Sequence, residues 1–126
     1  MQLAKLTAIR TNNKCRLVFA ASESSYDILR PDETVERTIS FLDYDPEGNI
    51  GYGCGNAIEN ATVSGGSLPG DFISYQYNKA TFNPNGIGSS GYVYMANGKG
   101  TAYAVGTWSS GVIVLKKWNN TTNSWD

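Results

Sequence analysis

The stretch GYVYMANGKGTAYAVGTWSSGVIVLKKW, residues 91–118, contains three apolar runs separated by two short polar turns. In the first run, at 92–95, tyrosines alternate with valine and methionine, which is the two-residue period of a β-strand. The turns contain Asn97-Gly98 and Ser109-Ser110-Gly111, whose residues suit tight hairpin connections. The stretch therefore predicts three consecutive strands joined as antiparallel hairpins.

Strand-like patterns of the same period also lie before this stretch. Apolar residues alternate with polar residues or glycine over six further short segments, at 15–21, 25–30, 34–41, 49–55, 71–77 and 80–82. Residues 56–70 are rich in glycine, serine and asparagine and are predicted to form a loop. Together these segments predict a mostly antiparallel β-sandwich of about eight strands.

The first part of the chain, residues 2–12, has helical rather than strand periodicity. Leu3, Leu6 and Ile9 recur at intervals of three, which places them on one face of a helix. Asn12-Asn13 follows and can supply a left-handed C-terminal cap. We expect this helix to pack on the sandwich through Leu3, Leu6 and Ile9.

The predicted helix has a marked end but no marked beginning. Met1 and Gln2 precede the apolar pattern without a serine, threonine, aspartate or asparagine to cap it. We therefore expect the helix to continue a longer one that precedes this chain. The alternative is a short terminal helix that frays.

Length and composition suit a single β-rich domain with no obvious catalytic group. The chain has 126 residues, 14 glycines, 8 tyrosines, no histidine and a net charge of −1. We expect one α+β domain over 1–126, with a helical part at 1–13 and a β-domain at 14–126. The lack of histidine removes the commonest general base and metal ligand, so an enzyme is the weaker class and no cofactor is expected. The near-zero charge gives no electrostatic reason for binding nucleic acid.

An acidic cluster resembles the start of a calcium-binding loop. Asp43, Asp45 and Glu47 occupy the first, third and fifth positions of that pattern, with glycine at the sixth. The twelfth position, where such loops place a bidentate glutamate, is Cys54. The alternative is an ordinary β-turn at 45–48, with proline second and glycine fourth.

Two lysines and a tryptophan end the last strand of the quoted stretch. Lys116, Lys117 and Trp118 could bind a single nucleic-acid strand by combining charge with base stacking. The alternative is a solvated strand edge, where lysine discourages pairing with another chain.

Three longer segments follow one another in an order typical of one protein family. LAKLTAIRTNNKCRLVF leads from the helix into the first strand, NKATFNPNGIGSSGYVYMAN lies in the second half, and YAVGTWSSGVIVLKKWN forms a final hairpin. In this order they resemble GspH/FimT-type pseudopilins, the minor pilins of type II secretion systems and type IV pili. The similarity extends from Leu3 to Trp125. It implies a helix packed on a pilin-like sandwich.

The resemblance also implies a structural subunit with no small-molecule substrate. In the full-length protein, a preceding apolar helix would anchor the subunit in the inner membrane and then pack into a filament with other pilins or pseudopilins. The domain itself would be soluble and would lie in the periplasm or in an extracellular filament. Its loops would contact neighbouring subunits or cargo.

Two alternative functions accompany this expectation. Some members of the family carry a basic Gly-Arg-rich motif in the last strand that is linked to DNA uptake, whereas here Val112 follows Gly111 and the lysines come later. The second alternative is a secreted carbohydrate-binding β-sandwich, which exposed tyrosine and tryptophan side chains on a β-scaffold would suit.

The resemblance implies a domain outside the cytoplasm, and this location affects the expected oxidation state of the two cysteines. A disulfide can persist outside the cytoplasm, and the strands that carry Cys15 and Cys54 could be neighbours with both side chains facing inward. The alternatives are therefore a Cys15–Cys54 disulfide and two separate buried thiols.

Overall fold

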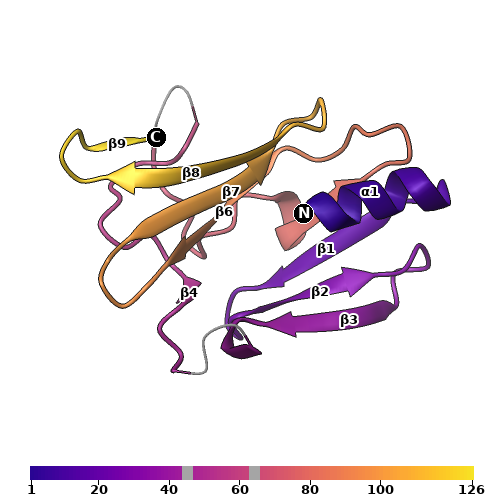
Figure 1. The fold of residues 1–126 in the computed structure, drawn as a ribbon, viewed down its shortest axis with the longest axis horizontal. Helices are drawn as coiled ribbons and strands as arrows, with labels where there is room; N and C mark the ends of the chain where they lie inside the picture. Colours follow the sequence, from indigo (N-terminus) through magenta and orange to yellow (C-terminus); the bar gives the residue numbers. More distant parts are fainter. Residues whose placement is uncertain (44–46, 63–65) are drawn as a thin grey trace.

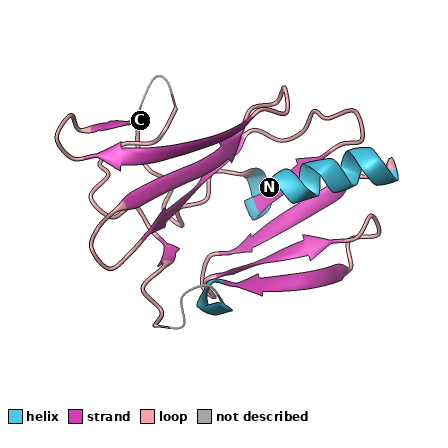
Figure 2. Cartoon of the chain, in the orientation of Figure 1, coloured by secondary structure: helices cyan, strands magenta, loops and turns pink. Residues whose placement is uncertain are grey.

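The computed structural model describes residues 1–43, 47–62 and 66–126, which form one α-helix and two antiparallel β-sheets (Figure 1). Helix α1 spans Gln2–Thr11 and leads into the first sheet, whose strand order is β3-β2-β1-β5. The second sheet has the order β4-β6-β7-β8-β9. Figure 2 shows the two groups of strands, with α1 lying along β1. The predicted α+β sandwich with an N-terminal helix is confirmed.

The strands are short and are joined mostly by tight turns. The first sheet consists of β1 Cys15–Ala20, β2 Ser25–Leu29, β3 Val35–Ser40 and β5 Lys79–Phe82. The second sheet consists of β4 Gly51–Tyr52, β6 Gly91–Ala96, β7 Ala102–Thr107, β8 Ile113–Asn119 and β9 Ser124–Trp125. Two single 3-10 turns lie outside the strands, η1 Phe41–Asp43 and η2 Gln76–Asn78.

The central hairpins of the second sheet are those predicted from residues 91–118. Strand β6 pairs antiparallel with β7, and β7 pairs antiparallel with β8. In the first turn, the carboxamide oxygen of Asn97 accepts two backbone N–H groups. Gly100 closes this turn with a φ of 83°, a conformation that glycine adopts without a steric cost.

The segment 71–77 departs from the prediction, because it forms no regular strand. Ile73 makes a single bridge to β6, and the chain then turns through η2, where Tyr77 and Asn78 have φ values of 56° and 55°. Left-handed backbone at two consecutive residues ends an extended run. Ile73 and Tyr75 are buried, as the alternating apolar pattern indicates, but the segment is not a strand.

Helix α1 forms as predicted, but it docks through a different face. Leu3, Leu6 and Ile9 are 47% to 63% exposed, whereas Ala4 and Ala8 are buried. The prediction that Leu3, Leu6 and Ile9 pack on the sheet is therefore wrong. With 3.6 residues per turn, the alanine face and the leucine face lie on opposite sides of a helix. Alanine has no atom beyond Cβ, so its face lets the helix backbone approach the sheet closely.

Hydrogen bonds hold α1 at its end and in its middle. Asn12 adopts the predicted left-handed cap with a φ of 54°, and its backbone N–H donates to the Ala8 carbonyl. The Lys5 ammonium donates to the Gly111 carbonyl at 2.8 Å, which joins α1 to the turn between β7 and β8. The helix is thus attached to both sheets.

A buried hydroxyl pair connects the segment 71–77 to the second sheet. The Tyr75 hydroxyl lies 2.7 Å from Thr107 Oγ1 in β7. Because Thr107 Oγ1 donates its own hydrogen to the Ser89 carbonyl at 2.6 Å, Tyr75 is the donor to Thr107. The Tyr75 ring stacks on Phe19 of β1 with a centroid distance of 5.7 Å, so one side chain contacts both sheets. Burial raises the pKa of Tyr75 to about 12.

Replacing Ala8 by leucine should destabilise the domain, because the added carbon atoms would separate α1 from the first sheet. We expect the free energy of unfolding to fall by about 1–3 kcal/mol, the usual cost of overpacking. Leu6→Ala is the matched control, and at its exposed position it should change stability by less than about 0.5 kcal/mol. Urea denaturation followed by circular dichroism measures both. A larger loss for Leu6→Ala would contradict the observed docking face.

The raised pKa of Tyr75 predicts a loss of stability at alkaline pH. Its ordinary value is 10.0 and its folded value is about 12, so the stabilisation is complete below pH 10.0 and is lost as the pH rises through the folded pKa. Tyr75→Phe should cost about 1 kcal/mol at neutral pH through the lost hydrogen bond. The variant should also show a smaller alkaline loss in thermal unfolding. An unchanged alkaline profile would rule out this assignment.

Candidate functional site

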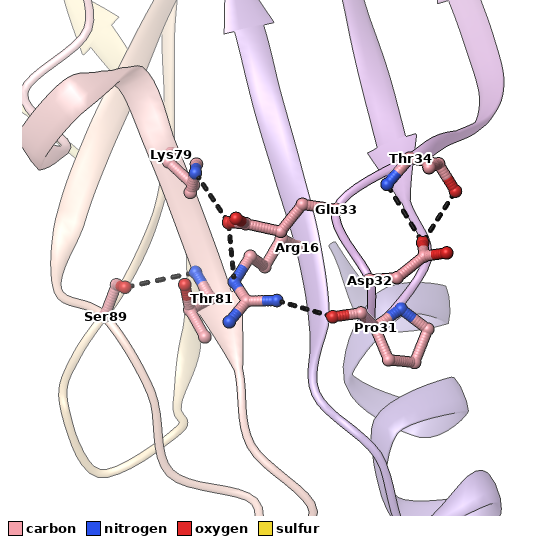
Figure 3. Close-up of polar contacts among 8 residues, drawn as sticks. All are labelled: Arg16, Pro31, Asp32, Glu33, Thr34, Lys79, Thr81 and Ser89. Carbon is pink, nitrogen blue, oxygen red and sulfur yellow. Dashed lines mark hydrogen bonds and ion pairs between the residues drawn. The ribbon is translucent and has the colours of Figure 1, made fainter.

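Three charged side chains from separate parts of the first sheet meet on the face turned away from the core (Figure 3). Glu33 Oε1, in the turn between β2 and β3, lies 3.0 Å from Lys79 Nζ of β5 and 3.7 Å from Arg16 Nε of β1. The Arg16 guanidinium also donates to the Pro31 carbonyl at 3.5 Å. The hydrogen bond from Lys79, together with the two positive charges, holds the pKa of Glu33 below its usual value.

The turn beside this cluster is held by its own side chains. The Asp32 carboxylate accepts the Thr34 N–H at 3.0 Å and the Thr34 hydroxyl at 2.6 Å, and these bonds lower the pKa of Asp32. Both carboxylates are exposed, so their ion pairs and hydrogen bonds add little stability. Among the residues drawn in Figure 3, the Thr34 hydroxyl and the Asp32 carboxylate bond to each other within one turn. Glu33 forms an electrostatic link from the β2–β3 turn to Arg16 of β1 and Lys79 of β5.

The structure separates the three residues predicted to contact nucleic acid. Lys116 Nζ donates to the Ala61 carbonyl at 3.0 Å. Lys117 lies on the opposite face of β8, with its Nζ 6.0 Å from the centre of the Tyr103 ring. Trp118 is buried, and a buried ring cannot stack on bases. The predicted joint contact by Lys116, Lys117 and Trp118 is therefore wrong.

Both cysteines are free, so the disulfide alternative is wrong. Cys15 lies in β1 of the first sheet and is buried in the core beneath α1. Cys54 follows β4 of the second sheet and packs beside Trp118 in a different cluster. Burial, and to a smaller extent the nearby Glu36 carboxylate, raises the pKa of the Cys15 thiol.

Thiol labelling tests this separation. Titration of the denatured, unreduced protein should find both thiols free. In the folded protein, N-ethylmaleimide should modify half-buried Cys54 well before Cys15, whose burial and raised pKa leave little accessible thiolate. Mass spectrometry of peptides after timed labelling measures the two rates, with Cys15→Ser and Cys54→Ser variants to assign them. Equal rates would contradict the different environments of the two thiols.

One residue of the candidate calcium loop, Asp45, lies outside the described residues. Asp43 ends η1, and Glu47 accepts a hydrogen bond from the Asn49 carboxamide at 3.2 Å. Within residues 1–43, 47–62 and 66–126, no three His, Cys, Asp or Glu side chains are grouped so that they could hold a metal ion. The site at Asp43, Asp45 and Glu47 stays a prediction.

An apolar stripe on α1 is the first surface that the fold leaves uncovered. We define it by Leu3, Leu6 and Ile9, the three aliphatic residues on the helix face opposite Ala4 and Ala8. Beside the stripe, a groove of about 350 Å³ runs between α1 and the strands β2 and β3. The sequence pattern singles out these three residues but predicts that they are buried, because they are the most apolar residues of the helix.

A groove between η2 and the β7–β8 turn is the second uncovered surface, and we call it the polar groove after the polar side chains that line its first part. It consists of two adjoining shallow depressions of about 330 Å³ and 420 Å³, and Ser90 lines both. Tyr77 lines the first and Trp108 lines the second. Sequence reasoning expected exposed aromatic residues but did not identify these two. The signal for Trp108 was its position directly before the serine-glycine turn at 109–111, where a side chain reaches solvent.

No helix in the described part of the chain has the length and apolar character that crossing a bilayer requires. No known protein family, curated protein or solved structure matches the chain.

Proposed function

We propose that the chain is the globular domain of a minor pseudopilin, a structural subunit of a type IV pilus or a type II secretion pseudopilus. The observation that carries this proposal is the apolar stripe on α1, which the domain leaves in solvent. The ordered sequence segments that resemble pseudopilins support it independently, because they extend over nearly the whole chain.

The stripe has the properties of a helix–helix contact. Its three side chains lie along one face of α1 and are 47% to 63% exposed, so burial by a neighbour would contribute about half of the roughly 1.5–3 kcal/mol that full burial of such a side chain supplies. The domain does not need them for its own core, because Ala4 and Ala8 already dock the helix. In pseudopilins the N-terminal helix is the element through which subunits assemble. An outward apolar face on that helix suits this role.

The placement of the cations supports a structural role over a DNA-binding one. Lys79 and Arg16 are both paired with Glu33. Lys116 is bonded to a backbone carbonyl, and Lys117 lies on the other face of β8. The described surface therefore lacks a cluster of unpaired cations at the positions named from the sequence, and such a cluster is the basis of phosphate binding.

Photo-crosslinking in cells of the source organism tests the proposal. A benzoylphenylalanine at position 6, in the middle of the stripe, should form crosslinks to a second pilin or pseudopilin subunit. The matched control is position 115, where Leu115 is 69% exposed, against 57% for Leu6, but lies on β8. The Leu6→Glu variant should fold with near-normal stability and should abolish filament function when it replaces the native residue.

The outcome at the two positions decides the matter. Crosslinks to filament subunits at position 6 and not at 115 would support assembly through the stripe. Crosslinks at neither position, together with full filament function in Leu6→Glu cells, would contradict the proposal.

A further inference from the structure

The polar groove has an exposed aromatic ring in each of its two parts. The Tyr77 side chain is 87% exposed and belongs to η2, whereas Trp108 is 50% exposed and precedes the β7–β8 turn. Neither the Tyr77 hydroxyl nor the Trp108 indole nitrogen has a hydrogen-bond partner in the part of the chain that the structure describes. The other two tryptophans pack against each other with a centroid distance of 5.3 Å. Trp108 therefore differs from the other two tryptophans, because its ring lines the groove and is half exposed.

Backbone conformation presents the Tyr77 ring to solvent. Tyr77 has φ 56° and ψ 23°, a left-handed conformation that is unfavourable for a bulky side chain, and Asn78 follows with φ 55°. Glycine would adopt this turn with less strain. Strained residues of this kind concentrate at binding sites, where the surrounding structure holds them. The ring contributes little to the core because it lies in solvent.

Neutral polar groups line the part of the groove that contains Tyr77, whereas the part that contains Trp108 is more apolar. Gln76 and Ser90 are exposed, and their side chains have no hydrogen-bond partner among the described residues. An amide and a hydroxyl can each donate and accept hydrogen bonds. Lys79 is the only cation among the described lining residues, and Glu33 already neutralises it at 3.0 Å. This lining favours an uncharged ligand rich in hydroxyl groups over a chain of phosphates.

We propose that the polar groove binds a neutral oligosaccharide. The rings of Tyr77 and Trp108 stack on the apolar faces of sugar units in the two parts of the groove. Gln76 and Ser90 hydrogen-bond the hydroxyl groups of the sugars between them. This binding site is separate from the apolar stripe of α1, so it does not depend on the proposed filament role.

Calorimetry and NMR with defined probes test this site. Cellohexaose, maltohexaose and chitohexaose are titrated into the folded protein, and at least one should bind saturably. The indole N–H signal of Trp108 should shift, whereas the signals of Trp118 and Trp125 should stay in place. Trp108→Ala should weaken binding at least about tenfold, which corresponds to 1.4 kcal/mol. Leu115→Ala, an exposed substitution outside the groove, should leave the affinity unchanged.

Tyr77→Gly separates binding from folding. Glycine relieves the left-handed strain, so the variant should melt at the same temperature as the original protein or higher, while its affinity falls at least about tenfold. A variant that melts normally and binds normally would show that Tyr77 takes no part. Together with an unaffected Trp108→Ala variant, that result would overturn the proposal.

Two further results would also overturn it. One is the lack of saturable binding to all three probes at concentrations up to about 10 mM, beyond the weak end of specific affinity. The other is tighter binding of an oligothymidylate that displaces the sugars and loses affinity steeply with salt. That behaviour would assign the groove to single-stranded nucleic acid.

Discussion

The close contact between α1 and the first sheet is the constraint on which the rest of the structure depends. Ala4 and Ala8 face the core that includes Leu17 and Phe82, so the helix backbone lies near the strands. A bulkier residue on that face would hold the helix away from the sheet. Because the opposite face of the same helix carries the leucines, docking through alanine places the apolar stripe in solvent. The packed core and the uncovered stripe therefore have one physical origin.

The segment 71–77 has a comparable double role at the other end of the core. Tyr75 is buried, stacks on Phe19 and donates to Thr107, and it thereby ties the two sheets together. Two residues later the chain turns through a left-handed conformation, and Tyr77 points into solvent. The turn then leads directly into β5. The same short segment closes the core and builds one end of the polar groove.

Three of the lysines are held by contacts within the domain. Lys5 and Lys116 donate to backbone carbonyls, and Lys79 is paired with a carboxylate. The net charge of the chain is −1, the stripe itself is aliphatic, and Lys79, the only cation among the described residues that line the polar groove, is paired. Both surfaces are therefore suited to short-range contact, by burial on α1 and by stacking and hydrogen bonds at the groove, more than to long-range attraction.

The sequence by itself determined the features that depend on neighbouring residues. The hairpins at 91–118, the helix and its Asn12 cap follow from a repeating period and from turn residues that act within a few positions. Only the tertiary structure decided which side chains are buried. Either face of α1 could in principle pack on the first sheet. The alanine face does so because its small side chains let the helix backbone come close to the strands, although the leucine face is more apolar. Likewise, the turn at 109–111 marks Trp108 as exposed, but nothing local marks Trp118 as buried, because burial depends on which distant segment covers the ring.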